Sequence, residues 1–149
     1  MQTVCKQKRY SYRRICMQDL FVRVKGIVKK DGKYLLLKRW VDDRIPDPFI
    51  WEFVDGVVNH GEAPDDAVKR SIHEALGVDG SIDKILYTWS GMQEETQWIG
   101  IAYLCSVNED DAAFALSEDF GEYCWVKRTE FEQYIENPFV LKDLEDVTL

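Results

Sequence analysis

Two glutamates, Glu62 and Glu74, and one arginine, Arg70, are spaced so that their side chains could meet in a catalytic site. Residues 56–62 read Gly-Val-Val-Asn-His-Gly-Glu, and Arg70 and Glu74 follow in a helix-like stretch. Four residues apart on a helix, Arg70 and Glu74 can form a surface ion pair that contributes about 0.3–0.5 kcal/mol. Glu62 has two open roles: it can satisfy the backbone N–H groups and the dipole at the start of the helix, or it can take part in catalysis.

The spacing of these residues resembles the signature of the Nudix hydrolase family. That signature is a glycine, five residues, a glutamate, seven residues, and then Arg-Glu-apolar-x-Glu-Glu-x-Gly-apolar. The chain matches it without a gap at Gly56, Glu62, Arg70, Ile72, Glu74, Gly77 and Val78. The flanking segments are also similar to the family, so that the resemblance covers about residues 18–136.

The resemblance implies an α+β fold, namely an α/β/α sandwich with a mixed central sheet. It also implies hydrolysis of a nucleoside diphosphate linked to another moiety, such as a nucleotide sugar, ADP-ribose or a nucleoside triphosphate, with Mg²⁺ or Mn²⁺ as cofactor. Such a cation neutralises the diphosphate and acidifies water. Because hard cations take oxygen ligands, the protein must supply clustered carboxylates.

The chain departs from the signature at two of the three helix glutamates. Ser71 and Ala75 take their places, and Glu74 remains. Positions 71, 74 and 75 span about 100° of arc on a helix, so three glutamates there would form one acidic stripe. With serine and alanine, the arc continues the apolar positions 68, 72 and 76, which is typical of a helix packed on a sheet without a metal.

Three functions therefore stay open. An active hydrolase could recruit other acids in place of the two missing ones. A domain without turnover could bind a nucleotide or sugar diphosphate as a sensor or regulator. The fold could also be a scaffold for protein–protein contact, for example as a homodimer. The lost carboxylates favour the binding domain, but family membership favours the hydrolase, and hydrolysis is therefore the expected function with the binding domain as the alternative.

Candidate residues follow from the resemblance and from side-chain chemistry. The candidate catalytic residues are Glu62, Arg70 and Glu74. The candidate metal ligands are Gly56, Glu74, Glu118, Asp119 and Glu122. Arginine forks suit phosphate and aromatic rings can stack on a base, and the candidate substrate-binding residues are Arg39, Arg44, Trp51 and Gly56. Further stacking candidates are Trp40, Phe49 and Trp89.

Apolar alternation predicts a hairpin before the signature. Residues 21–29 and 33–40 flank the pair Asp31-Gly32, which favours a two-residue turn because both turn positions need a positive φ. Residues 41–49 are polar and contain two prolines, which indicates a loop on the substrate side.

The helix of the signature has clear limits. Pro64 suits its first turn, Asp65 and Asp66 complement its dipole, and Gly77 suits the left-handed residue after its end. Strands are predicted at 51–54, 82–89, 98–107 and 123–126, a polar loop at 91–97, and a second helix at 129–135 that stops at Asn137-Pro138. The chain is predicted to be one domain, 1–149, with terminal extensions at 1–17 and 137–149.

Composition limits the partners. Among 149 residues, 19 are basic and 27 acidic, giving a net charge of −8 that disfavours bulk attraction to nucleic acid. The four cysteines form no C-x-x-C pair and are expected to be reduced. The apolar runs are too short to span a membrane, and residues 1–10 do not resemble a secretory signal, so we expect a cytoplasmic protein without membrane contact.

Overall fold

The hairpin predicted around Asp31-Gly32 is present. In a computed structural model that describes residues 19–40 and 50–149, β1 (Leu20–Lys30) and β2 (Lys33–Arg39) pair antiparallel across this turn. The φ angles are 51° at Asp31 and 74° at Gly32, so both turn residues occupy the left-handed region that the pair favours. The hairpin prediction is confirmed.

A mixed sheet forms the middle layer of the described residues. Its strand order is β3-β2-β1-β6-β5, with β4 paired to β1 and β7 paired to β2. β1 runs parallel to β6, and the other pairs are antiparallel. The remaining strands are β3 (Trp51–Glu52), β4 (Val54–Val57), β5 (Gly80–Gln93), β6 (Thr96–Val107) and β7 (Phe120–Val126).

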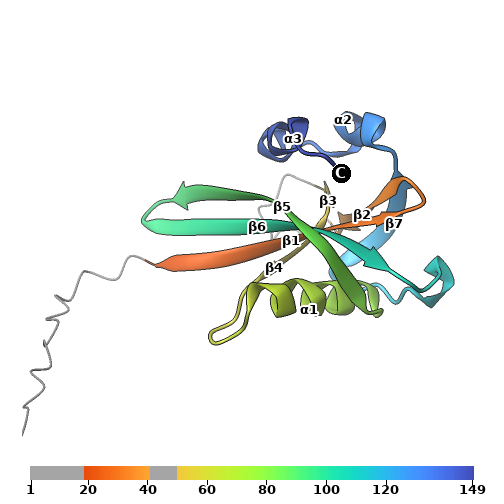
Figure 1. Ribbon diagram of the computed structural model, residues 1–149, viewed down its shortest axis with the longest axis horizontal. Helices are drawn as coiled ribbons and strands as arrows, with labels where there is room; N and C mark the ends of the chain where they lie inside the picture. Colours follow the sequence, from red (N-terminus) through yellow and green to blue (C-terminus); the bar gives the residue numbers. More distant parts are fainter. Residues whose placement is uncertain (1–18, 41–49) are drawn as a thin grey trace, which may run out of the picture.

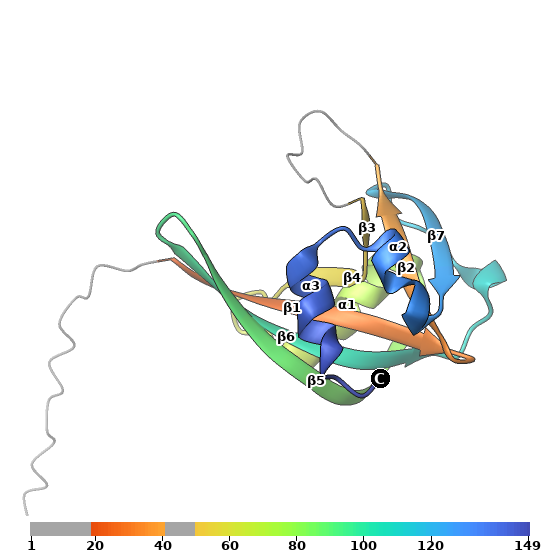
Figure 2. The same cartoon turned by 90° about the horizontal axis from the view of Figure 1, so that it is seen from above.

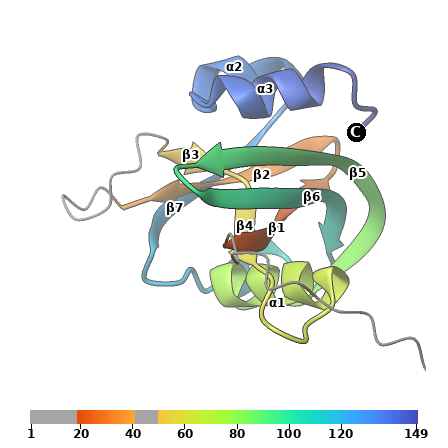
Figure 3. The ribbon, with the colours of Figure 1, turned by 90° about the vertical axis from the view of Figure 1, so that its left-hand side faces the viewer.

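Helices cover both faces of this sheet. α1 (Pro64–Leu76) lies on one face, while α2 (Phe131–Tyr134) and α3 (Pro138–Glu145) lie on the other (Figures 1 and 3). Seen from above, α2 and α3 cross over the strands near the middle of the molecule (Figure 2). The α/β/α sandwich with a mixed sheet is confirmed.

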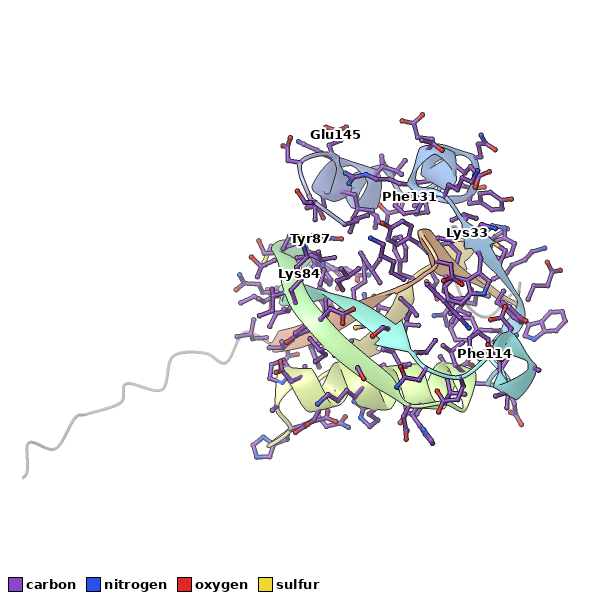
Figure 4. All side chains as sticks on the ribbon, turned by 45° about the vertical axis from the view of Figure 1, so that its right-hand side comes forward. Lys33, Lys84, Tyr87, Phe114, Phe131 and Glu145 are labelled. Carbon is purple, nitrogen blue, oxygen red and sulfur yellow. The ribbon has the colours of Figure 1, made fainter. Side chains whose placement is uncertain are left out.

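β1 supplies both layers of the core because its side chains alternate between the two faces. Val24 and Val28 belong to the cluster that packs on α1, whereas Ile27 belongs to the cluster beneath α2 and α3. In the second cluster Phe131 points from α2 toward the sheet, with its ring centroid 5.3 Å from that of Tyr34 (Figure 4).

The limits of α1 agree with the prediction. Pro64 occupies the first turn, and Gly77 ends the helix with φ 71°, its N–H donating to the carbonyl oxygen of His73 at 2.8 Å. The first turn is held to the sheet by Tyr103, whose hydroxyl donates to Asp65 Oδ1 at 2.8 Å. Burial of Tyr103 raises the pKa of its hydroxyl, so it remains a donor at neutral pH.

The loop predicted at 91–97 is wrong. β5 and β6 extend through most of this segment and pair as far as Gln93 and Thr96, with Glu94 in the left-handed region at φ 54°. Backbone pairing continues here although the side chains are polar, because one face of an antiparallel hairpin can remain in water.

The helix predicted at 129–135 is shorter than expected. A 3-10 turn, Arg128–Glu130, precedes α2, and the helix ends at Tyr134. The sequence did not indicate α3, which starts where a helix stop was predicted. The side chain of Asn137 accepts a hydrogen bond from the N–H of Phe139, and Pro138 opens the helix. Proline therefore begins a helix here, since its missing N–H is not needed in a first turn.

Among the helices in residues 19–40 and 50–149, none has the length and apolar character that a membrane crossing needs.

Candidate functional site

Arg70 is the centre of an ion-pair network at the start of α1. Its Nε lies 2.7 Å from Glu62 Oε1 and its Nη2 lies 2.9 Å from Glu62 Oε2, which makes a two-point pair. Its Nη1 lies 3.1 Å from Glu74 Oε2, and its Nη2 also donates to the carbonyl oxygen of Val57 at 2.8 Å. The guanidinium thus ties the end of β4 and the following loop to the helix.

The same network holds Glu62 as a carboxylate. The hydrogen bonds from Arg70 and the 2.9 Å bond from the N–H of Asn59 lower the pKa of Glu62 from 4.5 to about 2. Pairing with Glu62 raises the pKa of Arg70 above its ordinary value. The structure therefore brings together the three predicted catalytic residues, and they bind one another and the backbone.

Ser71 and Ala75 face the sheet and are closed off from solvent, each being 5% exposed. The hydroxyl of Ser71 donates to the carbonyl oxygen of Ala67 at 2.8 Å. Gly56 lies directly against it, because a Cβ added to this glycine would be 2.0 Å from Ser71 Oγ. Positions 71 and 75, where the family signature has glutamates, are thus buried in the packing of α1 on the sheet.

The residues at this position do not fit the divalent cation that the family implies. Ser71 offers a hydroxyl already bonded to the backbone, and Ala75 offers no oxygen. The carboxylate of Glu74 is 61% exposed and paired with Arg70. Within the part of the chain that the structure describes, no three His, Cys, Asp or Glu side chains form a group able to hold a metal. Hard cations require several such oxygens.

The other predicted metal ligands lie near the end of α1 and on β7. Glu118 and Asp119 are exposed in the segment before β7, and Glu122 on β7 pairs with Lys38 at 3.3 Å. The N–H of Ser117 donates to the carbonyl oxygen of Ala75 at 3.1 Å, which brings the segment before Glu118 against the helix. Metal binding by these acids stays a prediction.

A cavity of about 550 Å³ lies on the opposite face of the sheet, between the strands and α3. This volume is in the range of pockets for small organic ligands. Aromatic rings line it on several sides, from Trp51 on β3, Phe53 between β3 and β4, Trp89 on β5 and Phe139 on α3. Such walls suit a planar heterocycle.

Charged groups also face this cavity. Arg23 and Asp55, on the paired strands β1 and β4, form a salt bridge of 2.5 Å. The ammonium group of Lys25 lies 4.6 Å from the ring centroid of Trp89 in a cation–π contact. Burial lowers the pKa of Lys25, although Asp55 and Asp143 oppose this shift.

Two of the four aromatic stacking candidates line the cavity, namely Trp51 and Trp89. Trp40 lies elsewhere, 62% exposed and close to Gly121. Phe49 lies outside the described residues.

Of the two arginines predicted to bind substrate, Arg39 forms a 2.5 Å salt bridge with Glu52 and lies 5.4 Å from the ring centroid of Phe120. Arg44 lies outside the described residues.

Arg23, Lys25 and Asp143 line the cavity but were not among the site residues predicted from the sequence. A usable signal existed for the first two, because basic residues alternate with apolar ones along a strand that is otherwise buried. Charged side chains on such a strand need either a cavity that contains water or an oppositely charged side chain. Asp143 gave no local signal, since its position depends on α3.

Comparison with known proteins identifies the family. Residues 20–144 match the NUDIX domain family. A nucleoside triphosphatase NudI from Escherichia fergusonii is 33% identical over 130 residues, covering 79% of this chain and 89% of that protein. NudI from Salmonella heidelberg is 32% identical over 121 residues, covering 72% and 82%.

Solved structures agree on the fold. A MutT protein from Methanosarcina mazei Go1 superposes with a TM-score of 0.71 at 22% identity, covering 86% of this chain and 92% of that one. The ORF135 protein of E. coli gives a TM-score of 0.68 at 22% identity, with 86% and 88% covered. The chain belongs to the Nudix family, whose relatives above include hydrolases of small nucleotides.

Substitution of Gly56 by alanine tests the packing of α1 on β4. The added methyl forces Ser71 Oγ away from Ala67, so we expect the free energy of unfolding to fall by about 1–3 kcal/mol. Urea denaturation measures this change. In a Ser71→Ala background the cost of Gly56→Ala should shrink. Gly91→Ala is the control, because a Cβ there meets no atom within 4 Å. An equal loss of unfolding free energy in Gly56→Ala and Gly91→Ala would contradict the close contact between Gly56 and Ser71.

Glu62→Gln tests the network through pH. The folded pKa of about 2 lies below the ordinary 4.5, so the charged form stabilises the fold at neutral pH. This contribution is complete above the unfolded pKa and disappears as pH falls toward about 2. We expect wild type to be more stable than Glu62→Gln at pH 7 and the difference to shrink in acid, measured by urea midpoints. A difference independent of pH would show that the carboxylate charge does not matter.

Proposed function

We propose that the chain binds a nucleoside diphosphate derivative in the cavity between the sheet and α3, and that it lacks the metal-dependent hydrolysis of its family. One observation carries the proposal: Ser71 and Ala75 are buried where carboxylates would be needed, with the serine hydroxyl bonded to Ala67. Without those carboxylates the helix cannot hold the cation that neutralises a diphosphate and activates water.

The cavity supports the binding part of the proposal. Its aromatic side chains, including Trp51 and Trp89, suit a base, and its volume of about 550 Å³ suits a nucleotide. The guanidinium of Arg23, with 40% of its side chain exposed, lies where phosphate groups could remain partly in water.

Metal-dependent hydrolysis is the second candidate. Its support is the similarity to nucleoside triphosphatases, together with the segment before Glu118 that bonds to the end of α1. On this reading Glu74 and the acids near Glu118 replace the missing ligands. The homodimer and the cytoplasmic location stay predictions of the sequence.

Calorimetry in EDTA tests nucleotide binding. We expect at least one of ADP-ribose, UDP-glucose and the nucleoside triphosphates to bind. Trp51→Ala should raise its Kd about fivefold or more, because stacking contributes about 1 kcal/mol or more per base. Trp40→Ala, at an exposed tryptophan outside the cavity, should leave the Kd unchanged.

Phosphate release from the same ligands in the presence of Mg²⁺ or Mn²⁺ distinguishes binding without turnover from metal-dependent hydrolysis. We expect no more phosphate release from wild type than from Glu74→Gln. Turnover above that control would favour the hydrolase, and failure of every ligand to bind would reject the proposed binding.

Placing glutamates at positions 71 and 75 tests whether Ser71 and Ala75 are the reason why α1 binds no metal. In Ser71→Glu with Ala75→Glu, three carboxylates share one arc with Glu74, so we expect Mn²⁺ binding that wild type lacks. Calorimetric titration with MnCl₂ measures it. The variant with glutamine at both positions has the same side-chain size without the charge and should not gain binding. If the double-glutamate variant binds no more Mn²⁺ than wild type, the cause lies elsewhere.

A further inference from the structure

Lys25 lines the cavity and has no hydrogen-bonding partner among the described residues. The residue is 9% exposed, and its ammonium contacts the face of Trp89. No hydrogen bond or salt bridge joins this ammonium to any residue in 19–40 or 50–149. An ammonium has three N–H donors, and none of the described residues accepts from them. Among the described residues, the cavity thus contains a donor group without an acceptor.

Asp143 supplies an acceptor on the other side of the same cavity. It lies on α3, is half-buried, and accepts no hydrogen bond from the described residues. It is close enough to Lys25 to influence its charge, but no salt bridge joins them. Asp55 differs, because its carboxylate is paired with Arg23. The strand and the helix therefore present one donor and one acceptor to whatever occupies the space.

We propose that Lys25 and Asp143 select a base that carries a carbonyl beside a ring N–H, as in 6-oxopurines and 4-oxopyrimidines, over the corresponding amino bases. The inference rests on the proposed nucleotide binding. Lys25 donates to the carbonyl oxygen of the base, and the ring N–H donates to the carboxylate of Asp143. Lys25 is thus a specificity-determining residue that no family signature position marks.

The end of the cavity at Lys25 suits a base better than a phosphate. Among the described residues, the carboxylates of Glu52, Asp55 and Asp143 line the cavity together with the cations Arg23 and Lys25. Glu52 is paired with Arg39 and Asp55 with Arg23, whereas the carboxylate of Asp143 has no such ion pair within the described part of the chain and disfavours an anion near Lys25. Arg23 is more exposed, and on β1 it pairs with Val57 next to the loop that leads to α1, so phosphates find both water and a cation at that end.

Amino bases present donors and acceptors in the opposite order to the one that Lys25 and Asp143 would bind. Their exocyclic amino group would point N–H donors at the ammonium of Lys25, and their ring nitrogen would point a lone pair at the carboxylate of Asp143. Both protein groups would then lose contacts with water without gaining a hydrogen bond from the base. Sites that hydrogen-bond a polar group discriminate strongly against analogues that lack it.

The test uses two pairs of ligands whose bases differ mainly in the carbonyl or amino group beside the ring nitrogen. Calorimetry in EDTA compares IDP with ADP, and UDP with CDP. We expect wild type to bind the oxo member of at least one pair about tenfold tighter or more, the effect of a hydrogen bond to a charged group. Lys25→Met keeps the side-chain length and removes the donor, so the preference should fall to about twofold or less.

Two further variants sharpen the result. Lys33→Met, at the exposed β1–β2 turn away from the cavity, should keep the full preference (Figure 4). Asp143→Asn can donate to the ring nitrogen of adenine through its amide, so it should narrow or reverse the preference. If Lys25→Met does not fold, the wild-type comparison can still overturn the inference, and Asp143→Asn tests the cause of any preference.

The outcomes separate this inference from the proposed function. Equal binding of both members of each pair by wild type overturns the selection and leaves nucleotide binding intact. A wild-type preference that survives in Lys25→Met also overturns it. If no nucleotide binds, the proposed function fails and this inference fails with it.

Discussion

The close approach of α1 to the sheet is the constraint on which the rest of the structure depends. On β1, Gly26 leaves room for Val68, since a Cβ there would lie 3.2 Å from the valine Cγ2. On β4, Gly56 leaves room for Ser71 in the same way. Interiors pack as densely as organic crystals, so these two glycines set the distance between helix and sheet. That distance leaves positions 71 and 75 enclosed, where a serine and an alanine pack well.

Most positions of the Nudix signature have structural roles in this chain. Gly56 allows the helix contact, Glu62 and Arg70 clamp the loop to the helix, and Gly77 supplies the left-handed residue at φ 71°. None of these roles needs a cation. The spacing of the signature therefore identifies the fold, whereas the carboxylates on one arc of α1 decide the chemistry.

Features set within a few residues were predictable from the sequence, such as the positive φ of Asp31-Gly32 and the ends of α1 at Pro64 and Gly77. The pattern around Pro138 was ambiguous, because a proline can end one helix or begin the next. That Lys25 and Asp143 line the same cavity was not predictable. The two residues are far apart in the sequence and share a cavity because α3 lies over the sheet.

The cavity and the packing of α1 use opposite faces of β1, so the proposed ligand site is separate from the positions of the family's helix carboxylates. Val24 faces the core under α1, while Arg23 and Lys25 face the cavity, so substitutions on α1 leave the cavity lining unchanged. The proposed absence of the cation has a further consequence for the proposed nucleotide site. A site without a metal to neutralise the phosphates draws less binding energy from that end of a nucleotide. Affinity and selectivity would then depend more on the base, for which Lys25 and Asp143 line the cavity.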